Sequence, residues 1–380
     1  MKRKTELSLI NQLLSMIENK ETAMAADVYR NPVSDYTDRT QFDAEKALLF
    51  RNTPLVVGLS CELTDPGAYL TEDRAGVPIL VVRGDDNKLR AFANVCRHRG
   101  TKLLRDCGFA KKLISCPYHA WAYSRQGTLE HVPFEQGFER SDRATHGLTE
   151  LSLEERHGLI WVTPTAGTSV NFDQFLAGLD EDLSSFNLQN YHHYETRTLS
   201  QRMNWKLVVD TFLETYHLGA LHRATVYPII HGNVGTFDPF GSHLRNIYAR
   251  RSMDQLREVP EESWDLIEQT AMIYVLFPNT VLVMQGDHIE TWRIFPDYDD
   301  VNKTEMAVSL YTPELAKSES AKGHWDRNMD LLVKTVVEED FPIGEEIQRG
   351  FYSGAQSEII FGRNEPGLAH FHQRVKQVVC

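Results

Sequence analysis

Two short segments of this chain each carry one cysteine and one histidine at close spacing. Cys96 and His98 form the first pair, and Cys116 and His119 form the second pair after 17 intervening residues. Each pair lies in a turn between β-rich runs. Two loops that each present one thiolate and one imidazole suit a 2Fe–2S cluster whose cysteines bind one iron and whose histidines bind the other. A structural zinc is the alternative, but a zinc finger places both cysteines before both histidines.

A pair of histidines later in the chain can hold a second metal. His217 and His222 are five residues apart, so on a regular helix their side chains would point about 140° apart. They can share a metal only if the helix ends or bulges between them, and Gly219 lies in that interval. Two imidazoles and one carboxylate form the facial triad that binds non-haem Fe(II) and leaves positions open for O₂ and water. An isolated pair would more often be two ordinary histidines.

The hydrophobic pattern predicts the elements that must position these residues. Residues 1–30 are expected to be helical, and short β-rich runs from 54 to 165 predict a small all-β module. Asp85-Asp86-Asn87 is expected to form a hairpin turn between two of these runs. Beyond residue 165, helices are expected at 171–186, 206–222, 320–351 and 366–379, and strands at 272–296 and 304–311.

These patterns divide the chain into three parts. Residues 1–45 are expected to be an N-terminal helical segment that packs on the last domain. Residues 46–165 form the all-β domain with the Cys-His pairs, inserted after the first helix. Residues 166–380 form an α+β domain, in which helices lie on a sheet.

Composition and charge exclude several classes of protein. The 380 residues have a net charge of −13 and a pI of about 5.6, which argues against general nucleic-acid binding. No segment approaches the ~20 apolar residues of a membrane span, and the N-terminus lacks the apolar core of a secretion signal, so the cytoplasm is the expected location. Five cysteines make a poor disulfide framework. Cys61, Cys107 and Cys380 are expected to be small buried hydrophobic residues.

The chain resembles the α subunits of Rieske-type non-haem iron oxygenases over nearly its whole length. Residues 54–165 look like a Rieske domain, with the sequence CRHRG…CPYHAW. Thr101 and Tyr118 stand where respiratory-chain Rieske proteins carry an additional disulfide, which favours the oxygenase branch. The segment from Asn204 to His222 is similar to the family's iron-binding motif. The resemblance implies a helix-grip-like catalytic domain, in which an antiparallel sheet and helices hold a mononuclear iron.

The resemblance also assigns the metal ligands. The cluster would be held by Cys96, His98, Cys116 and His119. His217 and His222 would bind the mononuclear iron. Asp340 is the expected third ligand because the stretch Glu338-Glu339-Asp340, with Gln348 eight residues later, resembles the family's late acidic motif. Glu339 is the alternative third ligand, and an exposed acidic helix end is the plainer explanation of the stretch.

Two further acidic residues receive roles from the resemblance. Glu214 takes the place of the acid that connects a Rieske histidine of one subunit to an iron-binding histidine of its neighbour, along the path His119–Glu214–His217. Most members have aspartate there, and a plainer role for Glu214 is to orient His217. Asp210 either supports the site or faces solvent.

The implied activity is oxidation of a small molecule by O₂. Electrons from NAD(P)H would come through a separate reductase, with or without a ferredoxin, because the chain has no nucleotide-binding glycine motif. Transfer between subunits implies a homotrimer or a multiple of three, and some members add a β subunit. Mono- or dioxygenation of an aromatic or alicyclic substrate is expected. An oxidative N- or O-demethylase or quaternary-amine monooxygenase is the alternative, although such enzymes often have cysteine after the first histidine of the motif.

The substrate pocket is expected near the iron and the strands at 272–290, with a mostly apolar lining. The candidate residues are Tyr274, Leu276, Val283, Gln285 and His288. A non-catalytic Rieske electron carrier and a zinc-stabilised binding protein are the rivals from other classes. The second metal set argues against a carrier, which needs no second iron.

Overall fold

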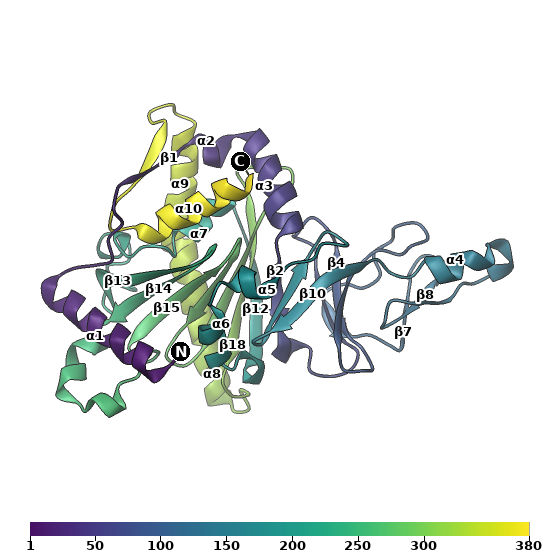
Figure 1. Cartoon of the computed structure of the whole chain (residues 1–380), viewed down its shortest axis with the longest axis horizontal. Coiled ribbons are helices and arrows are strands. Elements are labelled where there is room, and N and C mark those ends of the chain that lie inside the picture. Colours follow the sequence, from purple (N-terminus) through teal and green to yellow (C-terminus); the bar gives the residue numbers. More distant parts are fainter. Residues whose placement is uncertain (380) are drawn as a thin grey trace. The chain divides into compact units, whose positions relative to one another are not determined.

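The chain folds into two compact units, and the computed structural model describes residues 1–379. The larger unit comprises residues 1–49, 172–186 and the chain from 191 onward. The smaller unit comprises residues 50–171 and 187–190, so it interrupts the larger unit in the sequence (Figure 1). Among the described residues, no helix is long and apolar enough to cross a membrane.

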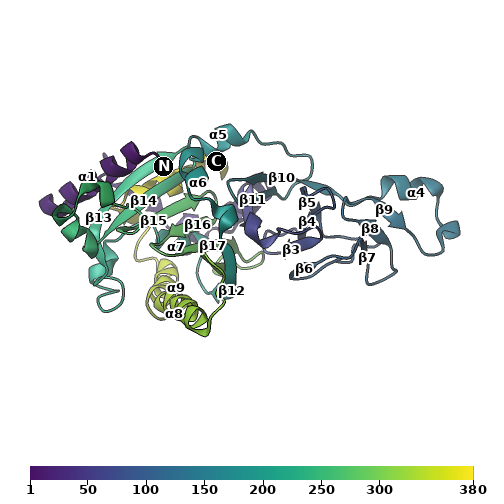
Figure 2. The ribbon, with the colours of Figure 1, turned by 90° about the horizontal axis from the view of Figure 1, so that it is seen from below.

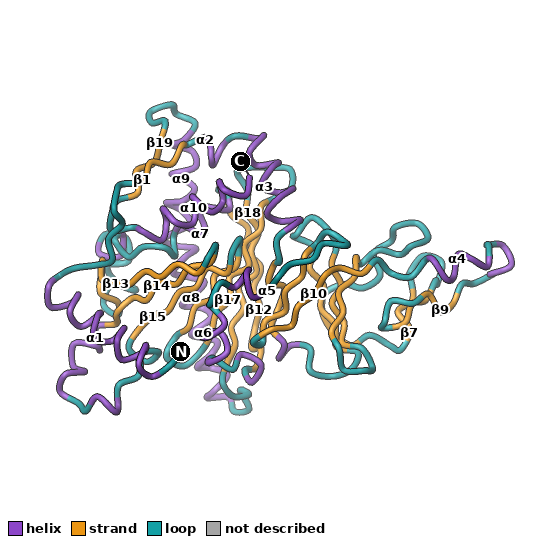
Figure 3. The backbone as a smooth tube through the Cα atoms, viewed as in Figure 1, coloured by secondary structure: helices purple, strands orange, loops and turns teal. Residues whose placement is uncertain are grey.

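The smaller unit is built from two antiparallel sheets, drawn as orange strands in Figure 3. Seven strands pair in the order β2-β11-β10-β5-β4-β3-β6, and three pair in the order β7-β8-β9. The bounds are β2 Leu55–Leu59, β3 Ala68–Glu72, β4 Ile79–Arg83, β5 Leu89–Ala93, β6 Cys107–Phe109, β7 Leu113–Ser115, β8 Ala122–Ser124, β9 Leu129–His131, β10 Glu150–Arg156 and β11 Leu159–Thr163, with helix α4 at Arg140–Thr145. The expected hairpin between β4 and β5 is confirmed, with Asn87 at φ 63°, a conformation that asparagine tolerates well.

A single buried cluster joins the strands of the smaller unit to its Cys-His loops. Phe92 of β5 and Leu129 of β9 pack in this cluster with Trp121. Cys96 and Cys116 belong to the same cluster. Because close packing restricts side-chain movement, the core holds both thiols in place.

A seven-stranded antiparallel sheet forms the centre of the larger unit (Figure 1). The strands follow the order β12-β18-β17-β16-β15-β14-β13. Their bounds are β12 His192–Gln201, β13 Ile230–Phe240, β14 His243–Arg250, β15 Thr270–Leu276, β16 Thr280–Met284, β17 Ile289–Pro296 and β18 Thr304–Thr312. Strands β15, β16 and β17 are buried along their whole length, which requires cover on both faces. A separate two-stranded sheet pairs β1 Tyr29–Pro32 with β19 Glu358–Phe361.

Helices cover the two faces of this sheet, with α5 and α6 on one face and α8 and α9 on the other (Figure 2). Tyr274 of β15 donates a hydrogen bond to Asp182 of α6 at 3.0 Å, which attaches α6 to its face of the sheet. Helix α8 continues through a π-helical turn, Val336–Asp340, directly into α9. The helix bounds are α1 Arg3–Asn19, α2 Ser34–Thr37, α3 Arg39–Asn52, α5 Phe172–Leu176, α6 Asp180–Ser185, α7 Trp205–Asp210, α8 Glu319–Thr335, α9 Phe341–Phe351 and α10 Pro366–Val379.

The helix expected over 206–222 is much shorter in the structure, since α7 ends at Asp210. The Glu214 carboxylate accepts hydrogen bonds from the backbone N–H groups of Tyr216 and His217. Such a side chain offers the backbone an alternative to helical bonding and turns the chain instead. Two other helices are also shorter than expected. The helix expected over residues 1–30 ends at Asn19. The segment 171–186 forms two helices instead of one, because residues with a left-handed backbone conformation separate them.

The expectation that Cys107 is buried is wrong, because the residue is exposed. It lies on β6, the edge strand of its sheet, whose residues are mainly exposed. Cys61 is partly buried, and Cys380 lies outside the described residues.

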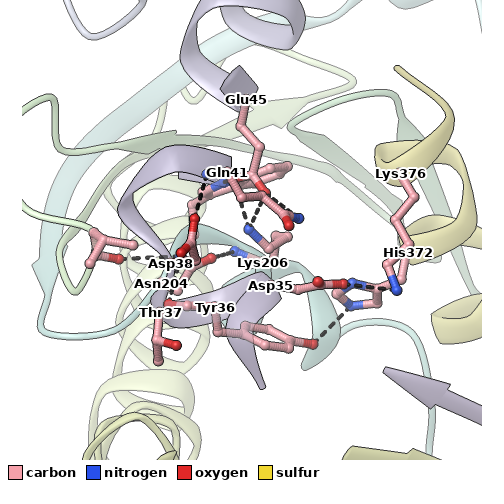
Figure 4. Close-up of polar contacts among 12 residues, drawn as sticks. Asp35, Tyr36, Thr37, Asp38, Gln41, Glu45, Asn204, Lys206, His372 and Lys376 are labelled. Atoms are coloured by element: carbon pink, nitrogen blue, oxygen red, sulfur yellow. Dashed lines mark hydrogen bonds and ion pairs between the residues drawn. The ribbon is translucent and has the colours of Figure 1, made fainter. Parts of the chain in front are cut away.

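A buried polar network ties the N-terminal helices to α7 (Figure 4). Lys206 Nζ lies 2.6 and 2.7 Å from the two carboxylate oxygens of Glu45, and the two side chains are 1% and 0% exposed. The Trp205 indole N–H donates to the same carboxylate at 2.9 Å. At the other end of α7, Asp210 accepts from the Tyr36 hydroxyl at 2.7 Å. The network therefore fixes the helix that precedes the histidine pair.

Replacing Lys206 by methionine is expected to destabilise the protein by roughly 3–5 kcal/mol, because it leaves the Glu45 carboxylate buried without its cation. The double variant Glu45→Leu, Lys206→Met is expected to recover much of this loss, because it removes both charges. Urea denaturation monitored by tryptophan fluorescence measures the effect. Lys322→Met is the control, because its ion pair with Glu319 is exposed and contributes little. Equal stability of the Lys206 and Lys322 variants would contradict the prediction.

Candidate metal centres and substrate cavity

The two Cys-His loops of the smaller unit have the same backbone hydrogen bonds. The N–H groups of Cys96 and Cys116 each donate to the carbonyl five residues later, at 2.8 and 2.7 Å. The N–H groups of Gly100 and Ala120 donate back to the cysteine carbonyls at 2.9 and 3.0 Å. Gly100 and Ala120 have φ values of 78° and 57°, in the left-handed region. The sequence therefore builds one turn twice, and each copy presents a cysteine and a histidine.

The residues expected to hold the cluster lie together. Cys96 and Cys116 are 2% and 4% exposed, and the rings of His98 and His119 are 4.7 Å apart. Burial raises the pKa of the Cys96 thiol, whose Sγ lies 3.3 Å from the Tyr123 hydroxyl. Among the described residues, buried His98 Nδ1 has no hydrogen-bond partner. Two buried thiols and an imidazole nitrogen without a partner fit a 2Fe–2S cluster with two cysteines and two histidines.

In the larger unit, the structure brings together His217, His222 and Asp340. One potential ligand atom of each residue lies within 4.8 Å of the others. Asp340 Oδ1 is 3.1 Å from His222 Nε2 and 3.7 Å from His217 Nε2. A short 3₁₀ turn at His217–Gly219 replaces a regular helix between the histidines, as their spacing required. Two imidazoles and one carboxylate fit the facial site of a non-haem Fe(II).

The π-helical turn places two consecutive carboxylates on opposite nitrogens of His222. Asp340 faces Nε2, and Glu339 hydrogen-bonds Nδ1. The Thr225 hydroxyl donates to Glu339 at 2.8 Å and fixes that carboxylate. A partner on Nδ1 sets the tautomer of the ring and leaves Nε2 for a metal. Glu339 therefore orients His222, and Asp340 is the carboxylate that faces both Nε2 atoms.

The two carboxylates beside His222 shift the pKa of its imidazole. Burial lowers the pKa of His222, but hydrogen bonds and charges from Asp340 and Glu339 outweigh burial and raise the pKa overall. Burial raises the pKa of Glu339, but hydrogen bonds from His222 and Thr225 lower it overall. The carboxylates thus compensate the positive charge that a divalent metal would bring.

Glu214 lies directly against His217. One carboxylate oxygen hydrogen-bonds His217 Nδ1, and the other accepts from the backbone N–H of His217 at 3.1 Å. Glu214 therefore fixes His217 as Glu339 fixes His222. Asp210 instead hydrogen-bonds the Tyr36 hydroxyl and, at 2.8 Å, His372 Nε2, so it joins α7 to α10.

A cavity of about 600 Å³ adjoins the triad within the larger unit. One wall comes from the sheet and the other from α8, including Leu331 and Thr335. Of the residues expected there, Val283, Gln285 and His288 line the cavity.

The expectation that Tyr274 and Leu276 line the cavity is wrong. Successive side chains of a strand point to opposite faces, and on β15 it is Ala271 and Ile273 that face the cavity. Tyr274 and Leu276 point to the other face, where the Tyr274 hydroxyl reaches Asp182. Choosing residues from this strand required the register, which a wholly buried strand does not reveal.

Comparison with known proteins identifies both units. Residues 53–145 match the Rieske 2Fe–2S domain family, and residues 188–379 match the catalytic domain of ring-hydroxylating α subunits. The chain belongs to the Rieske oxygenase α subunits. The expected family, fold class and cofactors, a 2Fe–2S cluster and a non-haem iron, are thereby confirmed.

Relatives of this oxygenase oxidise quaternary ammonium compounds, according to their names. It is 35% identical over 358 residues to the carnitine monooxygenase oxygenase subunit of Acinetobacter baumannii, covering 90% of this chain and 92% of that protein. The corresponding Escherichia coli K12 subunit is 29% identical over 368 residues, covering 91% and 93%. The crystal structure of the quaternary ammonium Rieske monooxygenase CntA with L-carnitine has the same fold, with a TM-score of 0.80, 23% identity and coverage of 93% and 97%.

Several residues of this oxygenase's site escaped the sequence analysis. Arg250, Trp292 and Tyr248 line the cavity from β14 and β17. Each is a single residue within a strand, and no motif marks it. Alternation along β14 places Tyr248 and Arg250 on one face, but only the structure shows that this face borders the cavity.

Proposed function

We propose that this oxygenase oxidises a small quaternary ammonium compound. The observation that carries the proposal is the aromatic wall of the cavity, made by Phe212, Tyr248 and Trp292. The rings of Phe212 and Trp292 are 5.1 Å apart, tilted by 57°. Aromatic faces attract cations, and quaternary ammonium groups are recognised by clusters of such rings.

Acidic groups of the same cavity support a cationic substrate. Glu290 is 3% exposed, lines the cavity and accepts from the Trp292 indole N–H at 3.2 Å. Asp287 also lines the cavity. Polarising the indole N–H by a carboxylate makes the ring face more attractive to a cation. An aromatic hydrocarbon has no positive charge for buried carboxylates to attract. The acidic groups therefore argue against the aromatic or alicyclic substrate first expected from the sequence.

The metal roles are part of the proposal. His217, His222 and Asp340 would hold Fe(II), whose chemistry is the activation of O₂. Cys96, His98, Cys116 and His119 would hold the Rieske cluster, which stores and delivers one electron at a time.

Electron delivery follows from the position of Glu214. Its carboxylate hydrogen-bonds His217 Nδ1. We therefore propose that electrons pass between two subunits along the path His119–Glu214–His217. This path requires a closed ring, for which we propose a homotrimer. A separate NAD(P)H-dependent reductase would supply the electrons.

The proposed reaction converts a C–H bond beside the cationic nitrogen into C–OH. One O₂, two electrons and two protons are consumed, one oxygen atom enters the product and the other leaves as water. The hydroxylated carbon then releases the nitrogen, which gives an amine and an aldehyde. The cavity residues position the cation against the aromatic wall and exclude water from the reacting bond.

Oxidation of a substrate panel by anaerobically purified, iron-loaded protein tests the proposal. With a compatible reductase, carnitine, γ-butyrobetaine or glycine betaine is expected to yield an amine and an aldehyde in equal amounts, with O₂ uptake. Metal and acid-labile sulfide analysis is expected to give about three irons and two sulfides per chain. Zinc in place of iron, or hydroxylation of indole or naphthalene with no turnover of any quaternary amine, would overturn the proposal.

A further inference from the structure

One guanidinium lies in the wall of the substrate cavity, at the end of β14. Arg250 Nη2 donates to Gln285 Oε1 at 2.5 Å, and Arg250 Nε donates to the Thr270 carbonyl at 3.2 Å. Both bonds go to neutral acceptors. Arg250 and Gln285 line the cavity. Since a guanidinium has five N–H donors in a planar fork, donors remain for a ligand.

The charge of Arg250 is incompletely compensated. Within residues 1–379, no carboxylate forms an ion pair with its guanidinium. Burial lowers the pKa of Arg250, and the more distant charges of Asp287 and Glu290 do not offset this. Glu290 is engaged by Gln285 and by the Trp292 indole. A half-buried guanidinium held by neutral groups keeps a positive charge that attracts an anion.

Strand geometry places this site at a defined distance from the aromatic wall. Tyr248 and Arg250 lie on the same face of β14, about 7 Å apart along the strand. The Tyr248 hydroxyl bonds the Phe212 carbonyl at 3.3 Å, and the charge of Glu214 contributes, after burial, to the raised pKa of Tyr248. Tyr248 therefore marks the end of the cavity near the triad, and Arg250 lies further along the same wall.

Two small residues line the same cavity wall as Tyr248 and Gln285. Ala271 pairs with Tyr248 across the sheet, and Gly286 follows Gln285. Both line the cavity. Because Arg250, Tyr248 and Trp292 line one cavity of about 600 Å³, a single small molecule can contact both the guanidinium and the aromatic wall.

We infer that Arg250, positioned by Gln285, binds the carboxylate of a zwitterionic substrate whose quaternary ammonium group lies against Tyr248 and Trp292. The inference rests on the proposed function and narrows it. The substrate class is a trimethylammonium carboxylate rather than a trimethylammonium alcohol or amide. A bidentate guanidinium–carboxylate pair fixes the distal end of the substrate and so determines which carbon faces the triad.

The test compares γ-butyrobetaine with its primary amide, which has the same shape but no negative charge. Binding is measured by anaerobic calorimetry and turnover by amine release. The wild-type enzyme is expected to favour the carboxylate by about 100-fold in Kd and in kcat/KM, because the amide leaves the guanidinium without its charge partner. In Arg250→Gln the preference is expected to fall to about 3-fold or less, and in Arg250→Lys to an intermediate value.

Arg257→Gln is the matched control. Arg257 is 51% exposed and pairs with Glu18, outside the cavity, so this variant is expected to keep the wild-type preference. Iron content and the visible spectrum of the cluster confirm folding of each variant. An equal preference in the wild type and Arg250→Gln would overturn the inference while quaternary amines are still oxidised. Failure of fully loaded wild-type enzyme to bind or oxidise either compound would instead overturn the proposed function.

Discussion

Replacing Asp340 by asparagine is expected to remove the mononuclear iron and reduce turnover by at least roughly 1,000-fold, because the site loses its anionic ligand. Asp340 Oδ1 faces the Nε2 atoms of His217 and His222. The four residues proposed to hold the Rieske cluster belong to the smaller unit, so this substitution does not change them. The iron content is therefore expected to fall from about three to about two atoms per chain, and the sulfide content is expected to stay unchanged.

Two neighbouring acids serve as comparisons on the same π-helical turn. Glu338→Gln is expected to behave as wild type, because Glu338 is 61% exposed and its ion pair with Lys334 lies on the surface. Glu339→Gln is expected to weaken iron binding by about 10- to 100-fold rather than abolish it, since Glu339 acts through His222. Loss of the iron in Glu339→Gln with full retention in Asp340→Asn would reverse the assignment of the third ligand.

Replacing Glu214 by glutamine is expected to leave both metal centres occupied and to slow electron transfer between them by about 100-fold. The amide keeps the shape of the side chain but cannot accept from His217 Nδ1 and from the backbone N–H groups at once. Single-turnover experiments with a reduced cluster measure oxidation of the cluster directly. They separate electron transfer from substrate binding.

Glu346→Gln is the control for this variant, since Glu346 is exposed on α9. Glu214→Asp is expected to restore part of the transfer rate, because aspartate keeps the charge. Iron content of the Glu214→Gln protein distinguishes a slow connection from a displaced His217. Wild-type transfer in a fully loaded Glu214→Gln protein would show that the path between centres does not use this carboxylate.

The candidate metal sites could be proposed from the sequence because metal chemistry restricts both residue type and spacing. The pairs Cys96-His98 and Cys116-His119 pointed to one cluster before any fold was known. The interval between His217 and His222 required an interruption, which the structure supplies as a 3₁₀ turn. Long strands and helices of the larger unit followed from hydrophobic patterning in the same way.

Features that depend on three-dimensional register were not predictable. In the sequence, Glu339 and Asp340 are equally suitable carboxylate ligands. Only the π-helical turn determines which of the two carboxylates faces both histidines. The end of α7 depends on hydrogen bonds from Glu214, which a hydrophobic pattern does not contain. Tyr274 was misplaced for a related reason, because every residue of its strand is buried.

The helical run from Glu319 to Phe351 carries both one cavity wall and Asp340. Leu331 and Thr335 on this run line the cavity. A larger side chain at either position would therefore displace the helix that also carries the Asp340 carboxylate. Ile273 and Val283 line the opposite wall on strands bonded on both sides. Libraries designed to broaden the range of compounds accepted should therefore vary the sheet wall and keep the helical wall constant.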